Sequence, residues 1–214
     1  MSNRKSSKLK EHISRYSADI VLLVETDQWW KNEMDPVMSE YPYSVKVPLE
    51  NTYGMLLYSK KPLNNTKVEY LIKKDVPSIH TEVEIDDCKI SLSCLHPEPP
   101  APTEADTSRP RDKELVVVAK KIKDLTLPCI ALGDLNDVAW SDTSTQFTRI
   151  SKMRDPRKGR GFFNTYNAKY PLLSWALDHV FLSNTFTVTE LEKLSKIGSD
   201  HYPIYIKCGI NKPD

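Results

Sequence analysis

The chain has 214 residues, of which 30 are Lys or Arg and 29 are Asp or Glu, so its formal net charge is +1. This near-neutral balance excludes a protein that binds polyanions through bulk attraction alone. Hydrophobic residues make up 39% of the chain, and no apolar run reaches the roughly 18 residues of a membrane span. The composition therefore indicates one globular domain covering residues 1–214.

The predicted elements begin with a helix over residues 6–16, because Leu9, Ile13 and Tyr16 fall on one helical stripe. A weaker helical pattern covers residues 26–42 and is interrupted at Pro36. Short apolar runs predict strands at residues 20–25, 54–59, 79–85 and 89–96.

A second clear helix is predicted over residues 109–125, closed by Pro128. Further strands are predicted at residues 129–134, 178–183, 185–191 and 203–208. Two segments are predicted to be long loops: residues 96–110, which contain five prolines, and the polar, basic and aromatic segment 141–173. Mixed helices and near-continuous apolar strands indicate an α/β (α+β) domain with sheets covered by helices.

The four cysteines are predicted to be free thiols rather than disulfides or metal ligands, since no C-x-x-C pair occurs among them. Free thiols favour a reducing compartment, and the polar segment MSNRKSSKLKEH lacks the apolar core of a signal peptide. We therefore expect a cytoplasmic chain, with a removed N-terminal membrane or export segment as the alternative. A nucleophile built from Cys94 and His96 is disfavoured, because the sulfur of a residue two positions away on one strand does not point at the ring.

Acids, amides and imidazoles gather at the ends of the predicted strands. They are Glu25, His96, Asp134, Asn136, Asp178, His179, Asp200 and His201. Strand ends are positions where a rigid scaffold presents catalytic groups. Each residue also has a plainer interpretation: Glu25 as a solvated terminus, GDLN as a turn, and a single histidine as a structural residue.

Taken in order, this set resembles the endonuclease/exonuclease/phosphatase superfamily of metal-dependent phosphoesterases. The motifs GDLN and GSDHYP are its specific part, and the likeness runs from about Ala18 to Ile206. The segments YGMLLYSKKPL, HPEPP and DHVFLSNTF are similar to a bacterial branch whose substrates are poorly defined. The resemblance implies a four-layer sandwich of two packed mixed β-sheets flanked by helices, as in pancreatic deoxyribonuclease.

The resemblance also implies roles at a metal centre. Glu25 matches the ligand of the catalytic divalent metal, Mg²⁺ or Mn²⁺, and Asp200 matches a further metal contact. Asp134 matches the base that deprotonates the attacking water, and Asn136 the amide that holds phosphate or water. Oxygen ligands around a hard cation suit this chemistry, since the cation neutralises charge that develops on a phosphate ester.

For the histidines, the resemblance implies that His201 contacts the scissile phosphate and that Asp178 orients its ring. A carboxylate beside an imidazole fixes its tautomer and stabilises the imidazolium. His96 matches a histidine of the deoxyribonuclease branch that assists at the phosphate or at the leaving oxygen.

The segment 149–160 is rich in Arg and Lys, and it reads either as a solvated loop or as a clamp for a polyanionic substrate. We assign Arg157 and Arg160 to substrate binding on the second interpretation. The aromatic residues of segment 162–175 belong either to the core or to a surface that stacks on bases. Trp140 and Trp175, next to GDLND and ALDH, are predicted to line the substrate pocket.

One departure from the superfamily pattern is expected. Its members usually begin with a strand that ends in an asparagine of the metal and phosphate site, whereas this chain opens directly into the helix at residues 6–16. Asn3 lies too close to that helix to be an easy substitute. We expect that strand to be missing and the activity to be weakened.

The sequence therefore predicts a monomeric, divalent-metal-dependent phosphodiester hydrolase that attacks its substrate in line with an activated water. DNA is the first candidate substrate. The alternatives are a phosphomonoesterase or a lipid or inositol phosphoesterase on the same scaffold, because a fold does not fix a substrate. A non-catalytic binding module is a further alternative from another class.

Overall fold

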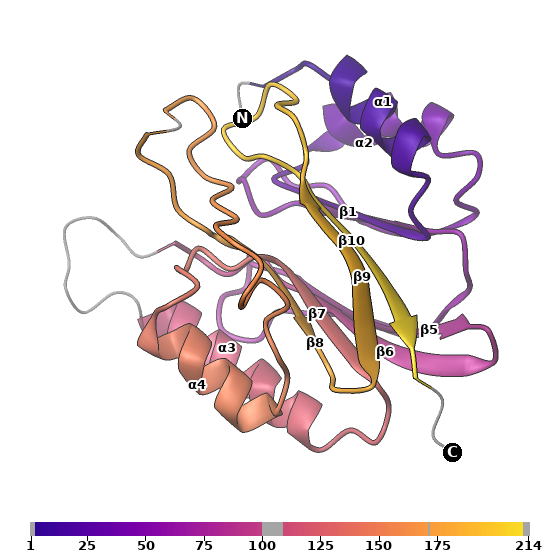
Figure 1. Ribbon diagram of the computed structural model, residues 1–214. Coiled ribbons are helices and arrows are strands. Elements are labelled where there is room, and N and C mark those ends of the chain that lie inside the picture. The colour runs from indigo at the N-terminus through magenta and orange to yellow at the C-terminus, as the bar shows by residue number, and fades with distance from the viewer. Residues whose placement is uncertain (1–2, 100–108, 171, 212–214) are drawn as a thin grey trace.

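The computed structural model describes residues 3–99, 109–170 and 172–211 (Figure 1). The helices are α1 (Ser7–Tyr16), α2 (Gln28–Met34), the 3-10 helix η1 (Asp35–Val37), α3 (Arg109–Lys123) and α4 (Asp142–Ser151). The strands are β1 (Ile20–Val24), β2 (Tyr43–Val47), β3 (Met55–Ser59), β4 (Leu63–Glu69), β5 (Ser78–Ile85), β6 (Cys88–Cys94), β7 (Cys129–Asp134), β8 (Asp178–Leu182), β9 (Phe186–Lys193) and β10 (Ile204–Ile210).

The strongly patterned elements form where the sequence predicts them, whereas three weakly patterned ones were not predicted. Strands β2 and β4 were missed, and β4 is a mostly exposed edge strand without an apolar run. Helix α4 lies inside the segment expected to be a loop. The Ser141 side chain caps it by accepting a hydrogen bond from the Ser144 amide, and Phe147 is its buried anchor. The weaker helical pattern is confirmed as α2 and η1, with Pro36 in the first turn of η1.

The described strands form sheets of order β1-β3-β2, β10-β9 and β4-β5-β6-β7-β8. The first two lie on one side of the molecule and the five-stranded sheet lies on the other, as Figure 1 shows. Helices α1 and α2 cover the outer face of the β1-β3-β2 sheet, while α3 and α4 cover the outer face of the five-stranded sheet. This is the predicted four-layer arrangement of helices, sheet, sheet and helices.

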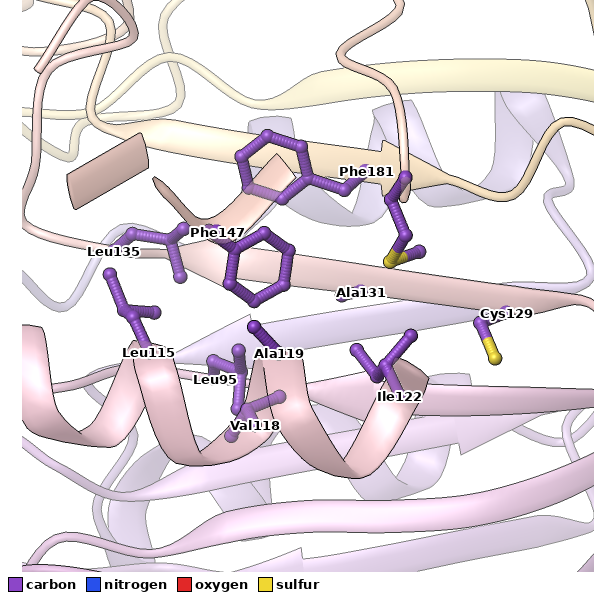
Figure 2. Packing of buried hydrophobic residues seen from close by; sticks show 11 residues of the cluster. Leu95, Leu115, Val118, Ala119, Ile122, Cys129, Ala131, Leu135, Phe147 and Phe181 are labelled. Atoms are coloured by element: carbon purple, nitrogen blue, oxygen red, sulfur yellow. The ribbon is translucent and has the colours of Figure 1, made fainter. Parts of the chain in front are cut away.

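Alternating side chains hold these layers together. In β3, Met55 and Leu57 face the core between the sheets, and Leu56 and Tyr58 face the helices. Strand β7 divides its side chains between the same inner core and the α3 and α4 layer. Figure 2 shows that second cluster, where the ring of Phe147 lies near that of Phe181, with centroids 4.7 Å apart.

The cysteines Cys88, Cys94, Cys129 and Cys208 are free thiols, as predicted. Burial raises the pKa of the Cys94 thiol, so the sulfur stays protonated and does not support a Cys94–His96 nucleophile. Over the described residues, none of the helices combines the length and the apolar character that crossing a membrane requires.

Candidate active site

A cavity of about 560 Å³ opens between the end of β1 and the starts of β8 and β10. Predicted site residues from four separate parts of the chain line it: Glu25, Asp134, Asp178, Asp200 and His201. Its lining also includes apolar residues such as Leu22 and Val24 of β1. The cavity thus combines titratable groups with apolar side chains, as ligand sites commonly do.

Strand pairing explains why two of the acids are neighbours. Strands β7 and β8 are antiparallel, and Asp134, the last residue of β7, is the register partner of Asp178, the first residue of β8. This register places the two carboxylates at the same end of the sheet. On the other side of β7, Gly133 permits the close approach of Leu95, because its φ is 143° and an added Cβ would lie 1.8 Å from the Leu95 carbonyl oxygen.

His201 lies between these two carboxylates. Its Nδ1 is 2.8 Å from Asp178 Oδ2, and its Nε2 is 3.5 Å from Asp134 Oδ2. Burial disfavours the imidazolium, but the hydrogen bond with Asp178 and the nearby carboxylates outweigh it and raise the His201 pKa to about 9. The ring is therefore a cation at neutral pH.

Burial and the adjacent Asp178 carboxylate raise the pKa of Asp134 to about 8. Its side chain is 3% exposed, and Oδ1 accepts a hydrogen bond from the Asn136 amide at 2.8 Å. Burial also opposes ionisation of Asp178, but the hydrogen bond with His201 prevails and lowers its pKa. Two adjacent acids thus have pKa values pushed apart, which is the pattern expected of an acid and base pair.

Asn136 and His96 lie next to Asp134 but are not among the residues that line the cavity. Asn136 adopts a left-handed conformation with φ of 50°, and its Nδ2 donates to the Pro97 carbonyl at 2.9 Å. His96 is buried, and its Nε2 lies 4.0 Å from Asp134 Oδ2. Burial lowers the His96 pKa to about 4, so this ring is neutral, and among the described residues its Nδ1 has no hydrogen-bond partner.

Glu25 and Asp200 form the outer part of the cavity lining. Glu25 has a left-handed backbone, with φ of 56°. Burial of its carboxyl group and the charge of Asp200 raise the Glu25 pKa. Lys169 Nζ is 3.8 Å from Asp200 Oδ2, which is an exposed and weak ion pair.

The donor set fits a hard divalent cation. Asp134, Asp178 and His201 offer ligand atoms that all lie within 4.8 Å of one another. These ligand atoms also pair with one another through the imidazole, and the carboxylates of Glu25 and Asp200 line the same cavity. Burial first and neighbouring carboxylates second raise the pKa values of Glu25 and Asp134, and a cation bound by oxygen ligands would favour their ionised forms.

The structure does not support the predicted contact of Arg157 with substrate. Arg157 is 7% exposed and pairs with the buried Asp155 at 2.7 Å, so its guanidinium faces the interior behind the site. Arg160, Trp140 and Trp175 are exposed but do not line the described cavity, so their roles in substrate binding stay predictions.

Two aromatic residues near the site were not singled out from the sequence. The Tyr166 ring lies 5.0 Å from the His201 ring, and the Tyr53 ring lies 5.7 Å from the His96 ring. Tyr166 belongs to the aromatic segment 162–175, but nothing in that segment distinguishes it from its neighbours. Its bridge to His201 depends on the tertiary fold.

Comparison with known families identifies the scaffold. Residues 2–201 match the model of the Endonuclease/Exonuclease/phosphatase family. The chain belongs to this family. No curated protein sequence matches the chain.

Solved structures of this family share the fold at low sequence identity. TDP2 from D. rerio, in complex with single strand DNA product, has a TM-score of 0.79 at 18% identity, covering 96% of this chain and 91% of that one. The human nocturnin catalytic domain with bound sulfate has a TM-score of 0.78 at 17% identity, covering 97% of this chain and 87% of that one. A mannosyl-6-phosphatase from Bacteroides thetaiotaomicron has a TM-score of 0.77 at 15% identity, over 97% and 91%.

Proposed function

We propose that the chain is a divalent-metal-dependent phosphodiester hydrolase, with DNA as its first candidate substrate. The observation that carries this proposal is the position of His201 between Asp178 and Asp134, in one cavity with Glu25 and Asp200. A cationic imidazole, a buried carboxylate of raised pKa and a set of oxygen ligands are the groups that hydrolysis of an anionic ester requires.

Each residue has a proposed part in a single in-line displacement. Glu25 and Asp200 would hold the cation, which when bound neutralises charge on the phosphoryl oxygens. In its ionised form Asp134 accepts a proton from the attacking water, and its raised pKa makes that carboxylate a stronger base than an ordinary aspartate. The water oxygen forms a bond to phosphorus as the bond to the leaving oxygen breaks.

The histidines bind the phosphate in this proposal. His201, kept protonated by Asp178, donates a hydrogen bond from Nε2 to a phosphoryl oxygen and stabilises charge in the transition state. His96 is neutral and lies on the other side of Asp134, where its ring can assist at the phosphate or the leaving oxygen. Asn136 orients the water or the phosphate from the same strand end.

DNA is the first candidate for two reasons. The TDP2 structure of the same fold is a complex with single strand DNA product. The exposed side chains of Lys158, Arg160 and Lys169 supply local positive charge. A phosphomonoesterase or a lipid or inositol phosphoesterase is the second candidate. The near-neutral net charge and the burial of Arg157 both weaken the case for an extended polyanion clamp.

The test is hydrolysis of plasmid and single-stranded DNA with Mg²⁺, with Mn²⁺ and with EDTA, beside a panel of phosphomonoesters and phospholipid phosphodiesters. We expect cation-dependent cleavage of DNA that EDTA abolishes. Asp86→Asn is the matched control for Asp134→Asn. Asp86 is exposed in the turn between β5 and β6, where its left-handed φ of 49° suits asparagine. Cleavage of the phosphomonoesters or phospholipids alone would move the assignment to the second candidate, and no hydrolysis at all would favour a binding module.

A further inference from the structure

A chain of buried polar groups lies beside the cavity and connects the turn that carries Asn136 with the start of β8, which carries Asp178. Its members are Arg111 of α3, Asp137, His179 of β8, Arg157 and Asp155, and each is 8% exposed or less. Buried charges of this kind are costly unless they are paired and hydrogen-bonded. Their partners therefore indicate what the chain of groups does.

Asp137 is the centre of the arrangement. Its carboxylate accepts hydrogen bonds from Ser141 and Ser144 and lies 3.4 Å from Arg111 Nη2. Its backbone carbonyl accepts a hydrogen bond from His179 Nε2 at 2.8 Å. Asp137 thus joins α3, the start of α4 and β8 directly after the GDLN turn.

The hydrogen bonds fix the state of His179. A guanidinium only donates, so Arg157 Nη2, 2.8 Å from His179 Nδ1, requires that nitrogen to be an acceptor. The ring proton is then on Nε2, where it is donated to the Asp137 carbonyl. The neutral His179 ring, with one donor and one acceptor nitrogen, therefore links Arg157 to Asp137, and Asp137 in turn pairs with Arg111.

Both arginines donate to the backbone of a proposed site residue. Arg111 Nη1 donates to the Asn136 carbonyl at 2.7 Å, and Arg157 Nη1 donates to the Asp178 carbonyl at 2.9 Å. Asn136 needs such support, because its φ of 50° is a conformation that L-residues seldom adopt. Each guanidinium is held in turn by a carboxylate, Asp112 for Arg111 and Asp155 for Arg157.

We infer that Arg111 and Arg157 are positioning residues, which hold the Asn136 turn and the Asp178 end of β8 at the separation that the reaction requires. The catalytic importance of this positioning rests on the proposed function. The restraint of the backbone by the two arginines does not. Neither side chain lines the cavity, so both act through the backbone of other residues. Groups that orient catalytic residues in this way are typically worth 10- to 100-fold in activity.

The first experiment compares Arg111→Met and Arg111→Lys with Lys113→Met, an exposed position in the same turn of α3. We expect Arg111→Met to lower kcat by about 10- to 100-fold with KM changed less than about 2-fold, and Lys to restore part of the loss. Lys113→Met should match wild type. A kcat for Arg111→Met within about 2-fold of wild type would overturn the role of Arg111.

Arg157 needs a different variant, because its removal alone leaves Asp155 buried without its partner. The double variant Arg157→Met with Asp155→Asn removes both charges and preserves most of the volume. We expect it to fold and to lose kcat as Arg111→Met does. A folded double variant with wild-type kcat would remove Arg157 from the proposal.

Amide hydrogen exchange separates this inference from the proposed function. In Arg111→Met, exchange of the amides at 135–138 should become faster while that of β5 and β6 stays unchanged. If the wild-type chain hydrolyses none of the substrates in the panel, the proposed function fails, and exchange still decides whether Arg111 restrains the loop. Unchanged exchange at 135–138 would overturn the restraint itself.

Discussion

At the scale of single residues, Asp134 is placed for reactivity at a cost in stability. Its carboxylate is almost fully buried next to Asp178, and both effects raise its pKa to about 8. Ionising a buried acid close to a like charge is costly, and acids perturbed in this way cluster at functional sites. The site therefore holds strain that a neutral side chain of the same shape would remove.

We predict that Asp134→Asn abolishes hydrolysis and increases the free energy of unfolding of the metal-free protein at pH 8. Asparagine keeps an oxygen to accept from the Asn136 amide but carries no charge beside Asp178. The expected gain is about 1–2 kcal/mol in the free energy of unfolding, measured by urea titration in EDTA. A clear drop in stability would instead assign Asp134 a structural role through its link to His201.

The site residues that the sequence predicts best are those fixed by strand ends. Asp134 and Asp178 could be placed together because one ends an apolar run and the other begins one. Arg157 and Tyr166 could not be placed, because a loop residue's burial depends on contacts distant in sequence. Nothing local distinguishes Arg157, which pairs with Asp155 in the interior, from the exposed Arg160 three residues later.

At the scale of elements, the close approach of β7 to the segment after β6 depends on Gly133. The Leu95 amide donates to the Leu132 carbonyl, and the Leu95 carbonyl occupies the place where a Cβ of residue 133 would lie. This approach brings the His96 strand end against the Asp134 strand end. The glycine is thus a structural requirement of the site.

We predict that Gly133→Ala destabilises the protein by about 3 kcal/mol or more, because the clash is with backbone and φ is positive. Gly209→Ala in β10 is the matched control: an added Cβ there meets nothing within 4 Å, and Gly209 is not among the positive-φ glycines. Chemical denaturation of both variants measures the difference. Equal stability of the two would mean that β7 can move away from Leu95 without cost.

The sequence predicts an element well when the element's own buried side chains stabilise it, and poorly when contacts with other elements do. Strand β3 is buried at every position, and its apolar run is therefore visible in the sequence. Strand β4 is exposed over most of its length and is held by pairing with β5, so little of its stability comes from its own side chains. Helix α4 is rich in Ser and Thr, which favour caps and turns, and forms because Phe147 packs between α3 and Phe181.

At the scale of the whole molecule, the site links folding to pH. The folded-state pKa of His201, about 9, lies above its ordinary value of 6.5, so its stabilising effect is complete below pH 6.5 and disappears as pH rises through 9. Asp134 acts in the same direction, because the folded state keeps its proton up to about pH 8 while the unfolded chain loses it near 3.8. Both groups therefore make the metal-free protein less stable as pH rises from 6.5 to 9.

We predict that the free energy of unfolding in EDTA falls by on the order of 2 kcal/mol between pH 6.5 and pH 9, and that His201→Gln reduces this fall. Mg²⁺ should also reduce it, because a cation stabilises the ionised carboxylates that high pH produces and binds only the folded site. Urea titrations at three pH values measure the fall for wild type and for His201→Gln, each in EDTA and in Mg²⁺. If the free energy of unfolding of His201→Gln falls as much as that of wild type, the His201 imidazole is not the cation that pairs with Asp178 and Asp134. If Mg²⁺ leaves the wild-type fall unchanged, the carboxylates of the cavity do not form its binding site.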